Sequence, residues 1–150
     1  SVVIASFVVY LIPEDTTMKI IVSDFEKYLD ITKEKTSMEV TSIDESFEKL
    51  MEKKTSPDEY IRIAEVSSSQ INSLIIELTN SGAAQEWYDS YANYIGALKK
   101  LNEKITETIV VANLMSGDSN SNSINEIIAK IHQLETESLD LMKKSDNTRP

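Results

Sequence analysis

The chain is rich in carboxylates, the side chains that acid–base catalysis and metal binding use most often. It holds 25 Asp and Glu residues but a single histidine, His132, and no cysteine. A di-metal site in a helical bundle needs inward-facing Glu residues with Glu-x-x-His pairs, and the residue three positions before His132 is Ala129. Without cysteine, disulfides, thiolate metal sites and thiol catalysis are excluded. We therefore expect no metal, no cofactor and no catalytic residue.

The remaining motifs that could support catalysis are also missing. Acid–base catalysis by carboxylates needs two of them in one cleft, with different pKa values. Most carboxylates of this chain lie between the apolar positions, on outward faces of the predicted helices. The segment from Asp118 to Asn122 alternates acid or amide with serine, yet lacks the central Gly and the distant Glu of an EF-hand. Weak binding of a cation by this segment remains an open alternative. No phosphate-binding glycine loop or nucleophile motif occurs, so we expect that the protein is not an enzyme.

An aromatic run is the feature that we single out as a candidate contact site. Trp87, Tyr91 and Tyr94 follow one another at spacings of four and three, which places them on one face of a helix. The main interpretation is an aromatic end of the hydrophobic core. The alternative is a contact patch for a protein partner or a pocket for a small ligand, because Trp and Tyr are enriched at interfaces. Tyr88 lies beside this face and should be the most exposed of the four.

Residues 2–12 form an uncharged apolar run that is unlike the rest of the chain, and Pro13, Glu14 and Asp15 follow it directly. As a helix the run would span about 16 Å, roughly half of the hydrocarbon core of a bilayer. The leading interpretation is the end of a membrane anchor. The alternatives are a β-strand that pairs with a neighbouring subunit and a buried terminal segment packed on its own domain. The residues concerned are Val2, Val3, Ile4, Phe7, Val8, Val9, Tyr10, Leu11 and Ile12.

Beyond this run, apolar residues recur at alternating spacings of four and three, the pattern of amphipathic helices. Ser56 and Ser123 are expected N-caps, and Gly82 is expected to adopt a left-handed conformation. Gly96, inside a helix, is explained by a close approach between helices. Residues 116–123 are all small or polar and predict a loop. The four predicted helices run from Thr16 to about Lys54, from Pro57 to Asn80, from Ala84 to Met115 and from Ile124 to residue 144.

Four such helices with short connections predict an all-α fold, an antiparallel up-down-up-down four-helix bundle with an apolar N-terminal segment. We assign residues 1–13 to that segment, 14–145 to the bundle and 146–150 to a frayed tail without an apolar anchor. The chain has only three Gly and three Pro, which argues against β-sandwich and α/β folds. The topology places both ends of the bundle together, so an anchor at residues 2–12 would put the tail near the same membrane.

The net charge of −10 opposes binding to the phosphates of nucleic acid. A bundle of this size entered from an apolar segment resembles, in architecture, the extracytoplasmic sensory domains of bacterial and archaeal chemoreceptors and sensor kinases. The resemblance covers residues 14–145 and carries over no ligand-binding residue.

Three hypotheses about function follow. The leading one is a non-enzymatic, membrane-anchored interaction domain, extracytoplasmic or at the cell surface, that contacts a protein partner or another copy of the chain within a larger assembly. The second is an extracytoplasmic sensory domain that holds a small ligand between its helices. The third is a filament or coat subunit that assembles through residues 2–12.

Overall fold

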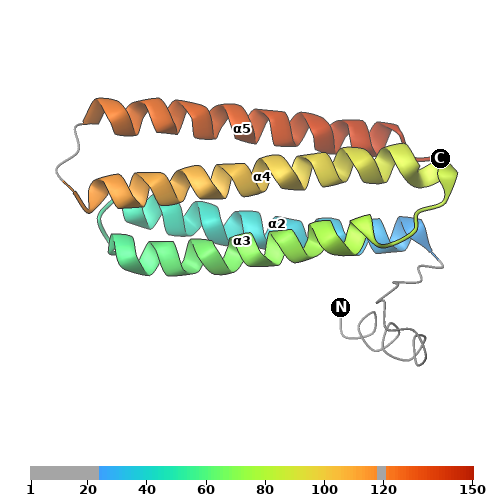
Figure 1. Ribbon diagram of the computed structural model, residues 1–150, viewed down its shortest axis with the longest axis horizontal. Coiled ribbons are helices and arrows are strands. Elements are labelled where there is room, and N and C mark those ends of the chain that lie inside the picture. The colour runs from blue at the N-terminus through green and yellow to red at the C-terminus, as the bar shows by residue number, and fades with distance from the viewer. Residues whose placement is uncertain (1–23, 118–120) are drawn as a thin grey trace, which may run out of the picture.

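The computed structural model describes residues 24–117 and 121–150. These residues contain no strand, and consecutive helices run in opposite directions (Figure 1). The prediction of an all-α antiparallel four-helix bundle is therefore confirmed. The elements are α2 (Phe25–Met51), α3 (Pro57–Thr79), the 3-10 turn η1 (Gln85–Trp87), α4 (Tyr88–Met115) and α5 (Ser121–Asn147).

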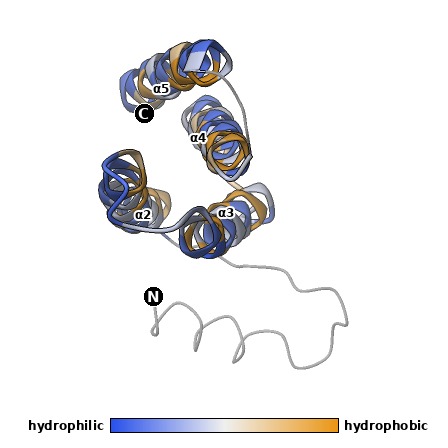
Figure 2. Ribbon diagram, turned by 90° about the vertical axis from the view of Figure 1, so that its left-hand side faces the viewer, coloured by the Kyte–Doolittle hydropathy of each residue, from blue (hydrophilic) through white to orange (hydrophobic). Residues whose placement is uncertain are grey.

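In cross-section the four helices form an arc with α4 as its central element. Figure 2 shows α2 and α5 at the two ends of the arc, with α3 and α4 between them. Helix α4 packs closely on both α3 and α5, whereas α2 packs on α3 and less extensively on α4. Of the described helices, α4 accordingly buries the largest set of side chains.

Helix α2 continues unbroken through its polar middle, as expected. Thr32 and Thr36 are buried, and their hydroxyls donate to the carbonyl oxygens of Tyr28 at 2.9 Å and Thr32 at 2.8 Å. Because each hydroxyl is satisfied one turn back along its own helix, these residues can face the core without an unpaired polar group. Large apolar side chains lie above and below them, with Leu29 and Ile43 fully buried.

The ends of α2 and α3 follow local capping chemistry. The Asp24 carboxylate accepts the Lys27 N–H at 3.0 Å and starts α2, whereas the part of the predicted first helix before residue 24 lies outside the described residues. Helix α2 ends at Met51, short of Lys54, because Lys53 adopts a left-handed φ of 60°. The predicted cap of α3 is confirmed, since the Ser56 hydroxyl accepts the Glu59 N–H at 3.2 Å. Gly82 is left-handed as expected, with φ of 64°.

Small residues bring α4 and α5 close together. Ser90, Ala97 and Val111 are fully buried at seven- or fourteen-residue intervals along α4. Opposite them, the Ser138 hydroxyl donates to the Ala97 carbonyl at 2.9 Å. A Cβ atom added at Gly96 would lie 3.4 Å from Cδ1 of Leu141, so this glycine faces α5, but the contact is with the end of a flexible side chain and does not by itself require glycine.

The C-terminal end differs from the expected frayed tail at residues 146–150. Helix α5 continues through Asn147, and Ser145 is fully buried against α4. The Thr148 N–H then donates to the Lys144 carbonyl at 3.0 Å, and Arg149 turns back onto the bundle. The expectation considered only apolar anchors, whereas this end is held by hydrogen bonds and ion pairs.

Candidate functional site at the aromatic end of the bundle

The four aromatic residues singled out from the sequence lie at the start of α4, where they divide into a buried set and one exposed residue. The exposed fractions are 9% for Trp87, 2% for Tyr91 and 1% for Tyr94, against 64% for Tyr88. The core interpretation therefore describes the first three, and Tyr88 is the one member of the four whose ring is exposed. Their spacing alone indicated this division, because Tyr88 lies off the shared helical face.

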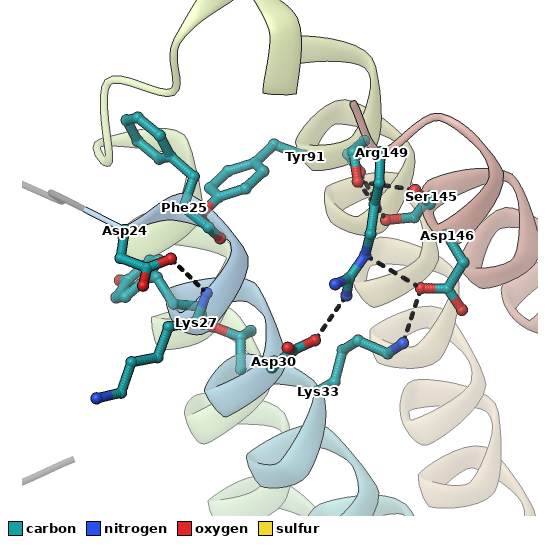
Figure 3. A network of polar contacts seen from close by, with 12 residues as sticks. Asp24, Phe25, Lys27, Asp30, Lys33, Tyr91, Ser145, Asp146 and Arg149 are labelled. Carbon is teal, nitrogen blue, oxygen red and sulfur yellow. Dashed lines mark hydrogen bonds and ion pairs between the residues drawn. The ribbon is translucent and has the colours of Figure 1, made fainter.

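Edge-to-face ring contacts join α4 to the first turn of α2. Tyr91 contacts Trp87 with centroids 6.2 Å apart and Phe25 with centroids 5.9 Å apart, at interplanar angles of 76° and 83°. Such pairs stabilise by about 0.5–1.5 kcal/mol each beyond their buried area. The Tyr91 hydroxyl donates to the Phe25 carbonyl at 2.8 Å (Figure 3), so Tyr91 is held both through its ring contacts and through its hydroxyl.

The buried tyrosines of the bundle are neutral structural groups. Burial raises the pKa of Tyr94 and of Tyr60 to about 12, although hydrogen bonds with Thr36 and Thr108 respectively act in the opposite direction. Burial also raises the pKa of Tyr28, where the Glu77 carboxylate adds to the effect. A phenol with a raised pKa holds its proton more firmly, so none of these three is a general base near neutral pH.

Next to the aromatic rings, four charged residues tie α5 to α2; we call Asp30, Lys33, Asp146 and Arg149 the C-terminal clasp. Lys33 Nζ lies 2.8 Å from Oδ1 of Asp146, and Arg149 Nη2 lies 2.8 Å from Oδ1 of Asp30 (Figure 3). The guanidinium carbon of Arg149 also lies 5.9 Å from the Trp87 ring centroid, within the range of a cation–π contact. The clasp thus links both ends of the arc to the start of α4.

A second ionic contact lies in the middle of the bundle, at Lys104 of α4. Its Nζ is 2.9 Å from Oδ1 of Asp44 on α2 and 3.8 Å from Oε2 of Glu135 on α5. The Lys104 side chain is 5% exposed, whereas those of Asp44 and Glu135 are 48% and 44% exposed. The ammonium is therefore buried between two carboxylates that remain in contact with water. This pair of contacts joins the two outer helices of the arc through the central one.

Sequence reasoning missed the clasp and Lys104. Lys104 stands seven residues after Ala97 and seven before Val111, so its heptad position was a signal that it faces α5. The pairing of Asp30 with Arg149 had no such signal, because it depends on the two ends of the chain meeting in space.

Metal and cation chemistry receive no support from the described part of the chain. Residues 24–117 and 121–150 contain no group of three or more His, Asp and Glu side chains that could hold a metal ion. The His132 side chain is 73% exposed, with Nδ1 3.9 Å from Oε2 of Glu135. The candidate cation segment from Asp118 to Asn122 lies partly outside the described residues.

The apolar residues 2–12 also lie outside the described residues, so the three interpretations of that run stay predictions. Among the helices that are described, none combines the length and the apolar character needed to cross a bilayer.

Comparison of the chain with protein family models, with curated proteins and with solved structures gave no match.

Proposed function

We propose that this chain is a non-enzymatic, membrane-anchored helical interaction domain, extracytoplasmic or at the cell surface, that serves as one subunit of a larger assembly. One contact carries the proposal: Arg149 reaches Asp30 at 2.8 Å. The first turns of α2 and the last residues of the chain therefore lie at the same end of the bundle (Figure 1). A domain held at one end in this way presents the long sides of its helices to partners.

The apolar run at residues 2–12 supplies the anchor in this proposal. It holds no charged residue, whereas the whole chain is 27% charged. Anchored there, the bundle stands with its aromatic end toward the lipid and extends by about 40 Å, the length of a helix the size of α4. The strongly acidic charge of the chain favours this upright position, because an acidic surface is repelled by anionic headgroups.

Exposed apolar side chains lie along the sides that such a domain would present. Met38 on α2 is 72% exposed, Val66 on α3 is 58% exposed and Leu139 on α5 is 52% exposed. Single exposed apolar residues are common on soluble proteins, so they support binding only where they combine into one surface.

Vesicle flotation of the full chain tests the anchor. We expect the chain to float with phosphatidylcholine vesicles and to be released by detergent, and we expect the variant Phe7→Asp/Val9→Asp to stay in the aqueous fraction. Each Asp near the centre of a membrane segment costs roughly 2.5–3.5 kcal/mol. The matched control is Met38→Asp/Leu139→Asp, which removes two exposed apolar residues of the bundle and should still float.

Two results would contradict the proposal. If the unmodified chain does not float, residues 2–12 do not by themselves hold the chain on a bilayer. If it instead forms regular oligomers that resist detergent and that Phe7→Asp/Val9→Asp abolishes, the run is an assembly element and the filament hypothesis replaces this one.

A further inference from the structure

The C-terminal clasp and Lys104 connect the two outer helices of the arc, α2 and α5, in a single antiparallel register. Lys33 of α2 pairs with Asp146 of α5 at 2.8 Å. Asp44 lies eleven residues after Lys33 and Glu135 lies eleven residues before Asp146, and these two carboxylates share the Lys104 ammonium. Eleven residues make about three turns of helix. Both links therefore lie along one line between the two helices, which we call the α2–α5 seam.

The α2–α5 seam is bridged by the tips of charged side chains, whereas the two helices do not pack closely on each other (Figure 2). In the same register, Val40 of α2 stands level with Leu139 of α5, because each lies seven residues from the Lys33–Asp146 pair. Leu139 is nevertheless 52% exposed and Val40 is only partly buried. Since apolar contacts stabilise in proportion to the area that they bury, apolar packing contributes little to holding α2 on α5.

The other seam of α5, against α4, is built differently. There the Ser138 hydroxyl donates to the Ala97 carbonyl at 2.9 Å, and the Ser90 hydroxyl donates to the Ser145 carbonyl at 2.7 Å. A serine side chain is short, so a bond from it to the backbone of the neighbouring helix requires the two helices to lie close together. Helices α4 and α5 thus form a close pair, and α2 is the helix that can change its distance from α5.

Helix α2 has tethers that such a movement preserves. At its first residue, the Phe25 carbonyl accepts the Tyr91 hydroxyl at 2.8 Å, and at its other end a short connection leads into α3. Along its length, the Glu39 carboxylate accepts the Ser67 hydroxyl of α3 at 2.8 Å. The middle of α2 can therefore turn away from α5 about its contact with α3 while both ends stay in place.

We infer that the α2–α5 seam is an electrostatic latch, which the C-terminal clasp and Lys104 hold closed at low ionic strength and which opens as salt screens these charges. Ion pairs between partly exposed side chains weaken as the ionic strength rises, and the side chains of Lys33 and Asp146 are 34% and 47% exposed. Opening uncovers Val40 and Met142, which are partly buried when the seam is closed. The apolar surface that the domain offers then depends on ionic strength, a property that goes beyond the proposed function and does not require residues 2–12 to be an anchor.

The distance between two spin labels tests the latch, because the chain has no cysteine of its own. Met38→Cys/Asp140→Cys places one label on α2 and one on α5, both at exposed positions. The full chain is measured in non-ionic detergent micelles and diluted with unlabelled chain, so that only distances within one molecule contribute. We expect a longer-distance population of at most about a tenth of the molecules near 0.1 M salt. It should grow several-fold near ~1 M salt, where the screening length falls from about 10 Å to about 3 Å.

The matched control is Lys99→Cys/Asp140→Cys, which keeps the label on α5 and places the other at an exposed position of α4. Its distances should be the same at both salt concentrations, because α4 and α5 are held by close packing and hydrogen bonds. This pair separates opening of the α2–α5 seam from loosening of the whole bundle.

Two further variants of the α2–α5 labelled chain separate the clasp from other ion pairs. Lys33→Gln/Arg149→Gln removes both cations of the clasp and should raise the longer-distance population several-fold already near 0.1 M salt, while circular dichroism shows unchanged helix content. Lys130→Gln breaks an ion pair between α4 and α5 and should leave the population unchanged.

The inference is overturned if the α2–α5 distances are the same at both salt concentrations, or if the α4–α5 distances lengthen together with them. A clasp variant that behaves like the unmodified seam near 0.1 M salt would equally contradict it. Vesicle flotation does not measure this seam, so failure of the latch leaves the anchor result standing, and the reverse is also true.

Discussion

Ser90 and Ser145 are joined by reciprocal hydrogen bonds, in which each hydroxyl donates to the backbone carbonyl of the other residue, at 2.7 Å and 2.8 Å. Both residues are fully buried. The two bonds fix the start of α4 to the end of α5. They hold the last helical turn in the position from which Arg149 reaches α2.

Replacing Ser145 with Ile should destabilise the bundle by about 2–4 kcal/mol, because it overpacks a close helix contact and removes the hydrogen bond that the Ser145 hydroxyl donates to the Ser90 carbonyl. The measurement is urea denaturation followed by circular dichroism. Ser42→Ile, at an exposed position of α2, is the control and should change stability by less than about 0.5 kcal/mol. Equal effects of the two substitutions would show that the Ser90–Ser145 contact does not constrain the helices.

The buried Lys104 predicts an asymmetry between two ways of removing its ion pairs. Asp44→Asn/Glu135→Gln should destabilise by roughly 1–3 kcal/mol, because it leaves a buried ammonium without a counter-charge. Lys104→Met keeps the buried stem and leaves two carboxylates that remain partly in water, so it should have a smaller effect. Chemical denaturation of both variants measures their free energies of unfolding. A larger loss of stability for Lys104→Met than for Asp44→Asn/Glu135→Gln would contradict the described geometry.

The C-terminal clasp should stabilise the fold in a salt-dependent way. Arg149→Gln should lower stability by about 1–2 kcal/mol at low salt, from the loss of the ion pairs with Asp30 and Asp146 and of the cation–π contact with Trp87. The difference should shrink in ~1 M salt, where the screening length is about 3 Å. Lys130→Gln, which breaks an exposed ion pair between α4 and α5, is the control. A loss for Arg149→Gln that is the same at both salt concentrations would assign the effect to packing rather than charge.

Alkaline pH should unfold the bundle through its buried tyrosines. The pKa of Tyr60 and Tyr94 is raised from 10.0 to about 12 in the fold, so folding favours the protonated phenol. The stability that comes from this protonation preference is complete below about pH 10, the pKa of tyrosine in the unfolded chain. It is lost as the pH rises toward about 12, the pKa of these tyrosines in the fold. Tyr60→Phe and Tyr94→Phe should each move the alkaline unfolding midpoint upward, whereas Tyr88→Phe, at an exposed position, should leave it unchanged.

Parallel measurements of tyrosinate absorbance and helix content check this prediction. The buried tyrosines should ionise together with the loss of helix. Ionisation of all tyrosines near their ordinary value, with the helices intact, would contradict the described burial.

Local pattern was enough to predict helices α2 to α5, both ends of α3 and the end of α4. It placed the start of α5 at Ile124 with Ser123 as its N-cap, whereas the helix begins at Ser121. The four-and-three spacing in α4, from Trp87 to Met115, indicates a helix with one buried face whatever surrounds it, because helical geometry itself sets which residues share a face. Ser56 could be recognised as a cap for the same reason, since its hydroxyl acts on a backbone group only three residues away. The division of the aromatic run into buried Trp87, Tyr91 and Tyr94 and exposed Tyr88 also follows from spacing.

Which helices are neighbours and which charges meet depends on how the helices pack in three dimensions. Amphipathic stripes show that a helix has a buried face, but they do not say which partner covers it, so the arc with α4 at its centre could not be read from them. The pairing of Asp30 with Arg149 joins residues at opposite ends of the described chain, and a charged residue in the sequence gives no sign of its distant partner. The helices and their inner faces could be predicted from the sequence, because they depend on contacts within a few residues. The clasp, the burial of Lys104 and the order of the C-terminal turn depend on side chains brought together from separate helices, which is why they required the folded molecule.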